Sequence, residues 1–330
     1  MIKNKIKQLT NPIEKELNEV NTLISAILNK EQVESVLEIN KHIDNKKGKR
    51  LRPILLLLSF FMTENDKKND IKNVIKIGSA IEFIHMASLV HDDIIDNAET
   101  RHNQITINKK WSNEVGIAHG IYLYSTALKL ISETKNINCL KEISESVQKL
   151  SLGELDQILT RNKNISIDQY YTIIENKTAT LFETCLKCGG HLNSINEKEL
   201  NILQNIGYSL GILFQISDDY LDIFDSTNEL KKGKGQDILK GELTLPIILL
   251  LKKYNKKDQE NFLKKIKDQN NSIFNEIKNE INIHNISEEI NEIIKVQYHN
   301  IIKNLDYFKP SKYKSSITEI ANYIYNRSQK

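Results

Sequence analysis

The sequence predicts an all-α protein, and three observations favour that class. Apolar residues recur at helical spacing through most segments of the 330-residue chain, which is the pattern of amphipathic helices. Runs of alternating Val, Thr and aromatic residues between turn signals, which would indicate strands, are missing. Only 4 Pro and 12 Gly occur, and no linker rich in Gly, Ser or Pro divides the chain. We therefore expect a single helical domain over residues 1–330.

The predicted helices follow one another with loops at 45–49, 98–110 and 226–241, where Gly, Lys and Asn gather. The motif-bearing core is expected over about 45–250, and the Lys-, Asn-, Glu- and Ile-rich end, about 258–330, is expected to form amphipathic packing helices. The predicted helical segments are 11–44, 53–63, 71–97, 111–133, 137–161, 167–192, 197–224 and 243–254.

Composition argues against several classes of protein. A net charge of +3 provides no global basic field for nucleic acid. Residues 1–18 are too polar for a secretory signal, and the most apolar run, Pro53–Met62, is too short to span a bilayer. Three Cys, an odd number, exclude a disulfide framework and fit a reducing compartment. We expect no transmembrane segment and a cytoplasmic location or an organelle stroma, with peripheral membrane contact left open.

Cys185 and Cys188 form a CxxC pair. A zinc site of this kind needs a second pair of ligands, and the sequence offers no second CxxC. Ordinary helix packing is therefore the favoured interpretation of this pair.

Two copies of one acidic pattern stand far apart, at 92–96 (DDIID) and 218–222 (DDYLD). Positions four apart lie on one face of a helix, so each copy presents two carboxylates to the same side. Apolar neighbours make these repelling charges costly unless cations lie between them. Carboxylate oxygens without clustered Cys or His suit a hard ion, Mg²⁺ before Zn²⁺. A solvated acidic helix face is the alternative for either copy alone.

Polar and basic residues accompany both acidic patterns. His85 lies two helical turns before Asp92, and Gln215 stands in the same relation to Asp222. The basic run 46–52 opens the apolar helix, and a helix start beside Lys and Arg favours phosphate. Together with six aspartates, these residues predict a site for Mg²⁺ and more than one polyphosphate. The further candidates are Arg101, Lys177, Thr178 and the run 231–234.

Several motifs in one order give the chain its resemblance to a known family. From Gly48 to Pro246 the sequence contains GKRLRP, IEFIHMASLVHDDIID, NKTATLFE, FQISDDYLD and DILKGELTLP. On these motifs the chain resembles the trans-isoprenyl diphosphate synthases of the polyprenyl synthetase family, and in pattern most closely the medium- and long-chain members. The resemblance implies a helical bundle of the isoprenoid synthase type around a deep central cavity. It also implies a homodimer and two acidic motifs that face each other across the cavity mouth.

The resemblance also implies roles for individual residues. Asp92, Asp96 and Asp218 would hold two or three Mg²⁺ ions on the allylic diphosphate, with Asp93, Asp219 and Asp222 in support. The implied catalytic residues are these three metal ligands with Lys177 and Gln215. Isopentenyl diphosphate would be bound by Lys49, Arg52, His85 and His102. The allylic diphosphate would be bound by Arg101, Lys177, Thr178, Gln215 and Lys232, with Lys234 as the alternative to Lys232 and Gln157 near the metals.

The implied reaction is a condensation. Mg²⁺ and the basic residues would stabilise the leaving diphosphate, the allylic C–O bond would ionise, and the isopentenyl double bond would attack. Ala87 and Ser88, one turn before Asp92, are small, so the product is expected to be geranylgeranyl or longer, as in quinone tails. Tyr122 and Tyr124 would either close the product tunnel deeper down or pack in the core.

Two positions depart from the family pattern. His102 stands where the family usually has a second arginine, and Ile121 stands where an acid is frequent. They leave a noncatalytic, tunnel-shaping subunit of a heteromeric synthase as an alternative, and a class I terpene cyclase is a weaker one. Both acidic patterns are intact, and this favours the catalytic synthase over the two alternatives.

Overall fold

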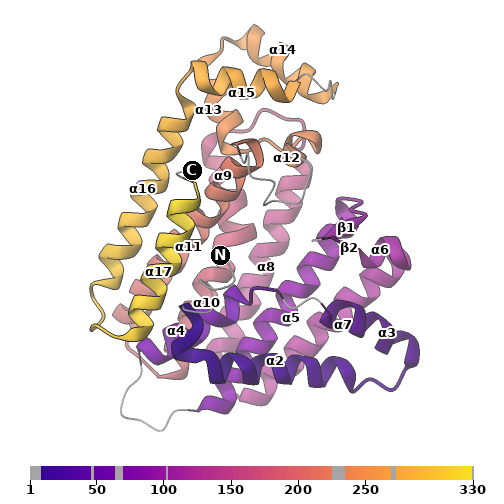
Figure 1. Cartoon of the computed structure of the whole chain (residues 1–330), viewed down its shortest axis with the longest axis vertical. Coiled ribbons are helices and arrows are strands. Elements are labelled where there is room, and N and C mark those ends of the chain that lie inside the picture. The colour runs from indigo at the N-terminus through magenta and orange to yellow at the C-terminus, as the bar shows by residue number, and fades with distance from the viewer. Residues whose placement is uncertain are drawn as a thin grey trace. The chain divides into compact units, whose positions relative to one another are not determined.

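Helices make up almost all of the structure, a computed structural model, as the sequence predicts (Figure 1). The structure describes residues 9–45, 48–63, 70–101, 103–224, 235–268 and 273–328. Two compact units interleave along the chain. The first comprises Met1–Val147, Phe182–Gln204 and Leu305–Glu319, and the second comprises Gln148–Leu181, Asn205–Asn304 and Ile320–Lys330. The expected single domain and its central cavity stay predictions.

The first unit is built around α5 (Ile71–Ile95), the helix that ends in the first acidic motif. Asp70 caps its start by accepting a hydrogen bond from the backbone N–H of Asn73. Helix α5 packs against α2 (Glu14–Asn29), α4 (Leu51–Met62) and, most extensively, α7 (Asn113–Thr134). Helices α5 and α7 approach closely because Gly120 has no side chain: a Cβ there would lie 2.1 Å from His91 Nε2.

The segment 11–44 is not the single helix that its sequence predicts. It forms a short 3₁₀ turn, η1 (Asn11–Ile13), followed by α2 and α3 (Glu34–Asp44), with a break between the two α-helices. Side chains bridge the break, because Asn40 donates to the carbonyl of Leu28 and Ser25 donates to Asp44. These contacts link residues 12 and 19 positions apart, so helical periodicity alone does not reveal them.

The predicted loop 98–110 contains three short elements. Strands β1 (Thr100–Arg101) and β2 (Gln104–Ile105) pair antiparallel, with Thr100 opposite Ile105 and Arg101 opposite Gln104, and α6 (Ile107–Lys110) follows. Asn103 turns the hairpin with a positive φ of 64°. Two-residue strands are too short to show alternation, so local pattern does not reveal them. The hairpin follows the C-terminal end of α5 and places Arg101 beside the first acidic motif (Figure 1).

Within the described residues, one helix is long and apolar enough to cross a membrane, judged by length and composition alone. This helix is α5, whose apolar stretch is mostly buried inside the protein. Burial of this kind is typical of a core helix. The predicted absence of a transmembrane segment stays a prediction.

The second unit carries the other acidic motif near the end of α11 (Glu197–Phe224). The predicted helix 167–192 is instead α9 (Ile167–Ile174), a π-helical turn η2 (Glu175–Ala179) and α10 (Thr180–Leu192). Two close approaches hold η2 in place. A Cβ on Gly153 of α8 (Ile137–Thr160) would lie 2.7 Å from the backbone nitrogen of Lys177. A Cβ on Gly211 would lie 2.4 Å from the Cα of Ala179. Such π turns are frequent at functional sites.

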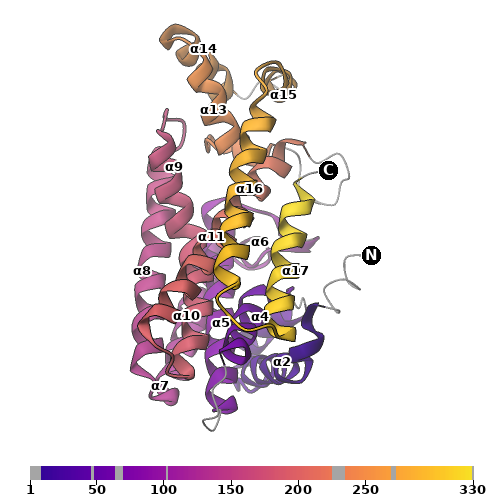
Figure 2. The ribbon, with the colours of Figure 1, turned by 90° about the vertical axis from the view of Figure 1, so that its left-hand side faces the viewer.

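The C-terminal segments are helical, as expected. They comprise α13 (Leu245–Lys253), α14 (Lys256–Lys267), α15 (Ile273–Ile283), α16 (Ile286–Leu305) and α17 (Lys312–Arg327). In the second unit, the last turns of α17 lie beside α16, and Tyr298 stacks on Tyr325 with ring centroids 4.7 Å apart (Figure 2). One further helix, α12 (Gln236–Leu239), lies in a segment predicted to be a loop.

The three cysteines pack in the core of the first unit. Cys139, Cys185 and Cys188 are buried free thiols, and Cys139 Sγ contacts the carbonyl of Cys188 at 3.8 Å. Burial raises the pKa of Cys185 to about 12, which makes its thiol inert at neutral pH. The packing interpretation of the CxxC pair is confirmed.

Candidate active site

The first acidic motif closes α5. Asp92 lies in the last turn, and Asp96 is the C-cap, whose backbone N–H donates to the Asp92 carbonyl at 2.9 Å. Both side chains are partly exposed. A helix C-terminus carries partial negative charge, so carboxylates there are destabilising unless a cation is present. This setting suits a cation site.

Asp93, between them, is buried and faces a cation of the protein itself. Its carboxylate accepts from Arg101 Nε of β1 at 2.7 Å, and the two side chains are 10% and 23% exposed. The hairpin thus fixes Arg101, a predicted diphosphate ligand, against the helix. The supporting role expected for Asp93 stays a prediction.

Two residues predicted to bind isopentenyl diphosphate, Arg52 and His85, contact each other directly. Arg52 Nη1 lies 2.9 Å from His85 Nε2. Arginine only donates, so Nε2 accepts and the imidazole is neutral with its proton on Nδ1. Burial, reinforced by the charge of Arg52, lowers the pKa of His85 well below its ordinary value. Arg52 therefore supplies a permanent positive charge, and the Nδ1–H of His85 supplies a neutral hydrogen-bond donor.

The neighbouring basic residues divide between two roles. Lys49 is exposed at the start of α4, as a ligand-binding lysine would be. Arg50, which the sequence did not single out, adopts a positive φ of 54° and turns into the core. Its Nη1 forms a buried ion pair with Glu82 at 2.7 Å. Arg50 therefore anchors the start of α4, beside Lys49 and Arg52.

The role of Ala87 and Ser88 in limiting product length stays a prediction. Ala87 and Ser88 are buried on α5, one turn before Asp92. The Tyr124 ring of α7 lies 5.9 Å from the ring of His91. Burial and the charge of Asp92 raise the pKa of Tyr124 to about 12. Tyr124 therefore lies near the first motif.

The second motif has a different inner residue. Asp219, on α11, is 2% exposed and accepts from two neutral donors: Tyr170 Oη at 2.6 Å and Gln215 Nε2 at 2.8 Å. Thr178 Oγ1 in turn donates to Gln215 Oε1 at 2.8 Å. Burial, with the nearby charge of Asp237, raises the pKa of Asp219 to about 7. The sequence had predicted Gln215 and Thr178 as ligands, and the structure joins them through hydrogen bonds.

Asp218 contacts the end of the chain. Its Oδ1 forms an ion pair with Arg327 Nη2 of α17. The guanidinium also lies over the Phe214 ring, 5.1 Å from its centroid, and burial lowers the pKa of Arg327 to about 10. Arg327 lies in a segment predicted only to pack, and the sequence missed it because its partner is 109 residues away.

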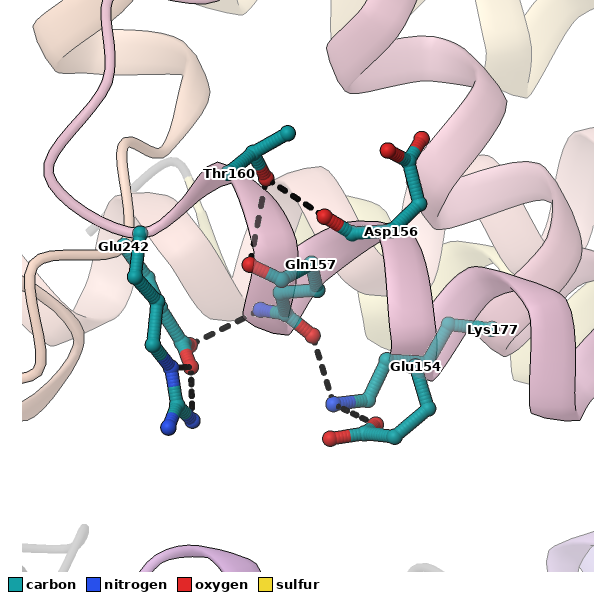
Figure 3. Close-up of polar contacts among 7 residues, drawn as sticks. Glu154, Asp156, Gln157, Thr160, Lys177 and Glu242 are labelled. Atoms are coloured by element: carbon teal, nitrogen blue, oxygen red, sulfur yellow. Dashed lines mark hydrogen bonds and ion pairs between the residues drawn. The ribbon is translucent and has the colours of Figure 1, made fainter.

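A chain of polar contacts holds Lys177 in the second unit (Figure 3). Its ammonium donates to Gln157 Oε1 at 2.6 Å and pairs with Glu154, and both partners lie on α8. Gln157 Nε2 donates to Glu242 Oε2 at 2.8 Å, so the amide lies between Lys177 and Glu242. The sequence predicted Lys177 and Gln157 as site residues but not Glu242.

The residues present fit a divalent cation. Each acidic motif offers hard carboxylate oxygens near a helix end, the ligand type that Mg²⁺ prefers. Within the described residues, no three His, Cys, Asp or Glu side chains form one group able to hold a metal. Asp92 and Asp96 belong to the first unit, and Asp218 and Asp222 belong to the second. His102, Lys232 and Lys234 lie outside the described residues.

Comparison with known proteins agrees with these features. A family model described as polyprenyl synthetase matches residues 33–283. Heptaprenyl diphosphate synthase component 2 of Bacillus subtilis is 31% identical over 88% of this chain and 82% of its own length. Octaprenyl diphosphate synthase of Escherichia coli is 31% identical over 74% of this chain and 73% of its own. The structure of a decaprenyl diphosphate synthase from Rhodobacter capsulatus superposes with a TM-score of 0.91 at 25% identity, covering 98% of this chain and 100% of that one.

The chain therefore belongs to the polyprenyl synthetase family. Because this family consists of prenyltransferases, the predicted enzyme class is confirmed together with the all-α fold. The roles assigned to individual residues stay predictions.

Proposed function

We propose that this chain is an all-trans polyprenyl diphosphate synthase that joins isopentenyl diphosphate to an allylic diphosphate in the presence of Mg²⁺. The observation that carries the proposal is the pair of DDxxD motifs, each near a helix C-terminus, where the helix dipole disfavours carboxylates unless a cation is present. Carboxylates arranged in this way suit divalent cations and the diphosphates they carry.

The protein's own residues have distinct tasks in this reaction. Bound Mg²⁺ would neutralise charge on the allylic diphosphate, which leaves with the electron pair of the C–O bond. Lys177 and Arg101 bind that leaving group as fixed cations. Arg52 and the Nδ1–H of neutral His85 orient isopentenyl diphosphate, whose double bond forms the new C–C bond. A proton is then lost to the released diphosphate, and the product is again allylic.

The product is proposed to be geranylgeranyl diphosphate or longer. Ala87 and Ser88 are small and buried on the helix that leads to Asp92, so they leave room for a growing chain. Ser88→Phe should shorten the product by at least one isoprene unit, read by mass spectrometry. An unchanged length distribution would place the limit elsewhere.

We propose a homodimer, in which the exposed face of α7 is covered by a second copy of the chain. Ile117, Ile121 and Leu128 are 49%, 56% and 55% exposed and recur at helical spacing. Ile121 is also one of the two departures from the family pattern, and an apolar residue there suits a contact between copies. The alternative is a heteromer, which the name of the Bacillus subtilis relative, a component 2, suggests.

Light scattering of the purified chain separates these states. A dimer that Ile121→Asp converts to monomers supports the proposal, whereas a wild-type monomer that needs another protein for activity contradicts it. Three buried free thiols are consistent with the reducing cytoplasm or stroma proposed as its location.

Incubation of the purified chain with isopentenyl diphosphate, geranyl diphosphate and Mg²⁺ tests the reaction itself. Linear prenyl diphosphates support the proposal. Cyclic hydrocarbon would indicate a terpene cyclase, and no product from the chain alone would indicate a noncatalytic subunit.

A further inference from the structure

Lys177 is held in one orientation by two partners. It lies on the π turn η2, with its side chain 29% exposed. An ammonium group has three donors. One donates to Gln157 Oε1 at 2.6 Å and another pairs with Glu154. The position of the lysine charge therefore depends on which end of the Gln157 amide faces it.

Glu242 determines which end of the Gln157 amide faces Lys177. The carboxylate accepts from Gln157 Nε2 at 2.8 Å, which leaves Gln157 Oε1 turned toward Lys177 (Figure 3). A carboxylate can only accept hydrogen bonds. The opposite amide orientation would set two acceptors against each other at Glu242 and two donors against each other at Lys177. That orientation is excluded while Glu242 is ionised.

Glu242 is itself fixed by Arg161. Arg161 donates to Glu242 Oε1 through Nε at 3.0 Å and through Nη2 at 2.6 Å. Glu242 is 8% exposed, and burial raises its pKa, while the Arg161 hydrogen bond opposes the rise. The backbone adds a second tie, because Asn162 N donates to the carbonyl of Gly241 at 2.7 Å. These hydrogen bonds hold the buried Glu242 carboxylate in one position.

We infer that Glu242 is a positioning residue for the allylic diphosphate, acting through Gln157 on Lys177. The inference rests on the proposed diphosphate-binding role of Lys177. The relay consists of hydrogen bonds from Arg161 and from Gln157 to Glu242 and of one from Lys177 to Gln157, so that every donor in it meets an acceptor. This relay holds the lysine charge where the leaving group binds.

Glu242→Gln tests the relay with little change in shape. The new amide keeps its oxygen on Arg161, so its NH₂ group faces Gln157. Gln157 must then turn its oxygen to residue 242 and its NH₂ group to Lys177, which displaces the ammonium. We expect the KM for geranyl diphosphate to rise about tenfold, the equivalent of one charge-assisted hydrogen bond, and kcat to fall as well, because Lys177 also stabilises the leaving group. The KM for isopentenyl diphosphate should not change.

The decisive test is the double variant Gln157→Glu with Glu242→Gln, in which the two side chains are exchanged. The carboxylate at 157 then accepts from both Lys177 and the amide at 242, which still accepts from Arg161. The net charge is unchanged, and every donor again meets an acceptor. The KM for geranyl diphosphate should return to within about twofold of the wild-type value. The relay would be overturned if the KM of the double variant stayed high while its thermal midpoint equalled that of Glu242→Gln, because the double variant would then be equally well folded.

Two further variants separate the inference from the function on which it rests. Lys177→Ala should weaken binding of inorganic pyrophosphate, measured by calorimetry. Unchanged binding would contradict the role of Lys177 and the relay together. Weaker binding in Lys177→Ala but not in Glu242→Gln would overturn the relay alone. Glu142→Gln, which removes a half-buried carboxylate paired with Lys187, is the matched control and should leave both KM values unchanged.

Discussion

The two acidic motifs share a pattern but not an environment. In the first, the inner carboxylate of Asp93 pairs with a cation, Arg101, at 2.7 Å. In the second, the inner carboxylate of Asp219 accepts from two neutral donors, Tyr170 and Gln215. One inner residue is held by charge and the other by hydrogen bonds in a buried setting, although the sequence around each reads DDxxD.

This difference shows what a short motif determines. Helical spacing alone puts the first and fifth residues of each motif on one face, so any sequence with this pattern presents a pair of carboxylates. The inner residue depends on what the surrounding fold supplies. In the first unit a hairpin brings an arginine, and in the second unit α9 brings a buried tyrosine. On the proposed function, the outer residues would carry the shared role and each inner residue would stabilise its own surroundings.

The largest effects should come from the outer residues. Asp92→Ala and Asp218→Ala should each lower kcat about a thousandfold or more, corresponding to about 4 kcal/mol of lost charge stabilisation. Turnover retained at ordinary Mg²⁺ in either variant would contradict the metal assignment.

The same two variants should differ in stability. Asp92→Ala removes a partly exposed carboxylate at the C-terminal end of α5, where the helix dipole disfavours negative charge, and should lower the thermal midpoint less than Asp218→Ala. Asp218→Ala removes the carboxylate that pairs with Arg327, a half-buried arginine, and should lower the midpoint by a few degrees. Equal midpoints in scanning calorimetry would contradict the role given to that ion pair.

Substitution of the inner residues should sharpen the comparison. Asp93→Asn leaves Arg101 without its charged partner and should cost about 1–3 kcal/mol of unfolding free energy. Part of that cost should disappear at about 0.5 M salt, because screening weakens the wild-type pair. Asp219→Asn should cost a similar amount without salt dependence, since its partners are neutral. Urea titrations at two salt concentrations measure the unfolding free energies of both variants. A cost that depends on salt in Asp219→Asn but not in Asp93→Asn would contradict the difference between the two inner residues.

Tyr170→Phe should have a smaller effect, about 1 kcal/mol of unfolding free energy. Its hydrogen bond favours ionised Asp219, so its removal should raise the pKa of Asp219 above the wild-type value of about 7. That pKa exceeds the ordinary value for aspartate, so the stability linked to the protonated carboxyl is present at acid pH and is lost as pH rises through about 7. In metal-free protein the variant should lose this stability at higher pH, and a shift to lower pH would contradict the assignment.

Arg327→Gln should have the smallest effect. On the proposed function, Arg327 and Mg²⁺ would compete for Asp218, so removal of the arginine should lower the Mg²⁺ concentration needed for half-maximal activity about threefold. Arg327→Lys should retain a wild-type requirement. A higher Mg²⁺ requirement in Arg327→Gln would show that the arginine assists metal binding instead.

Regular local features of the fold could be predicted from the sequence. The helices that carry the motifs were predicted at 71–97 and 197–224 and are found at Ile71–Ile95 and Glu197–Phe224. Local spacing did not reveal the break before α3, the hairpin at 100–105 or the π turn at Lys177. These features depend on tertiary contacts such as Asn40 with Leu28, which override local propensity.

The site could be predicted only in part, for a related reason. Spacing along one helix pointed to His85 with Asp92 and to Gln215 with Asp222. The partners that hold these sites come from distant segments: Glu242 is 85 residues from Gln157, and Arg327 is 109 residues from Asp218. No periodicity connects residues so far apart, so the structure was needed to find them.

The central claim is that the outer residues of both motifs serve one metal-dependent reaction. Conservative variants test it directly, because Asp92→Glu and Asp218→Glu should retain measurable turnover. The measurement is kcat for each single variant and for the double variant at saturating substrates and Mg²⁺. If the motifs act as a unit, the loss in the double variant will be clearly smaller than the product of the two single losses. Losses that simply multiply would contradict the claim and indicate that the motifs act independently.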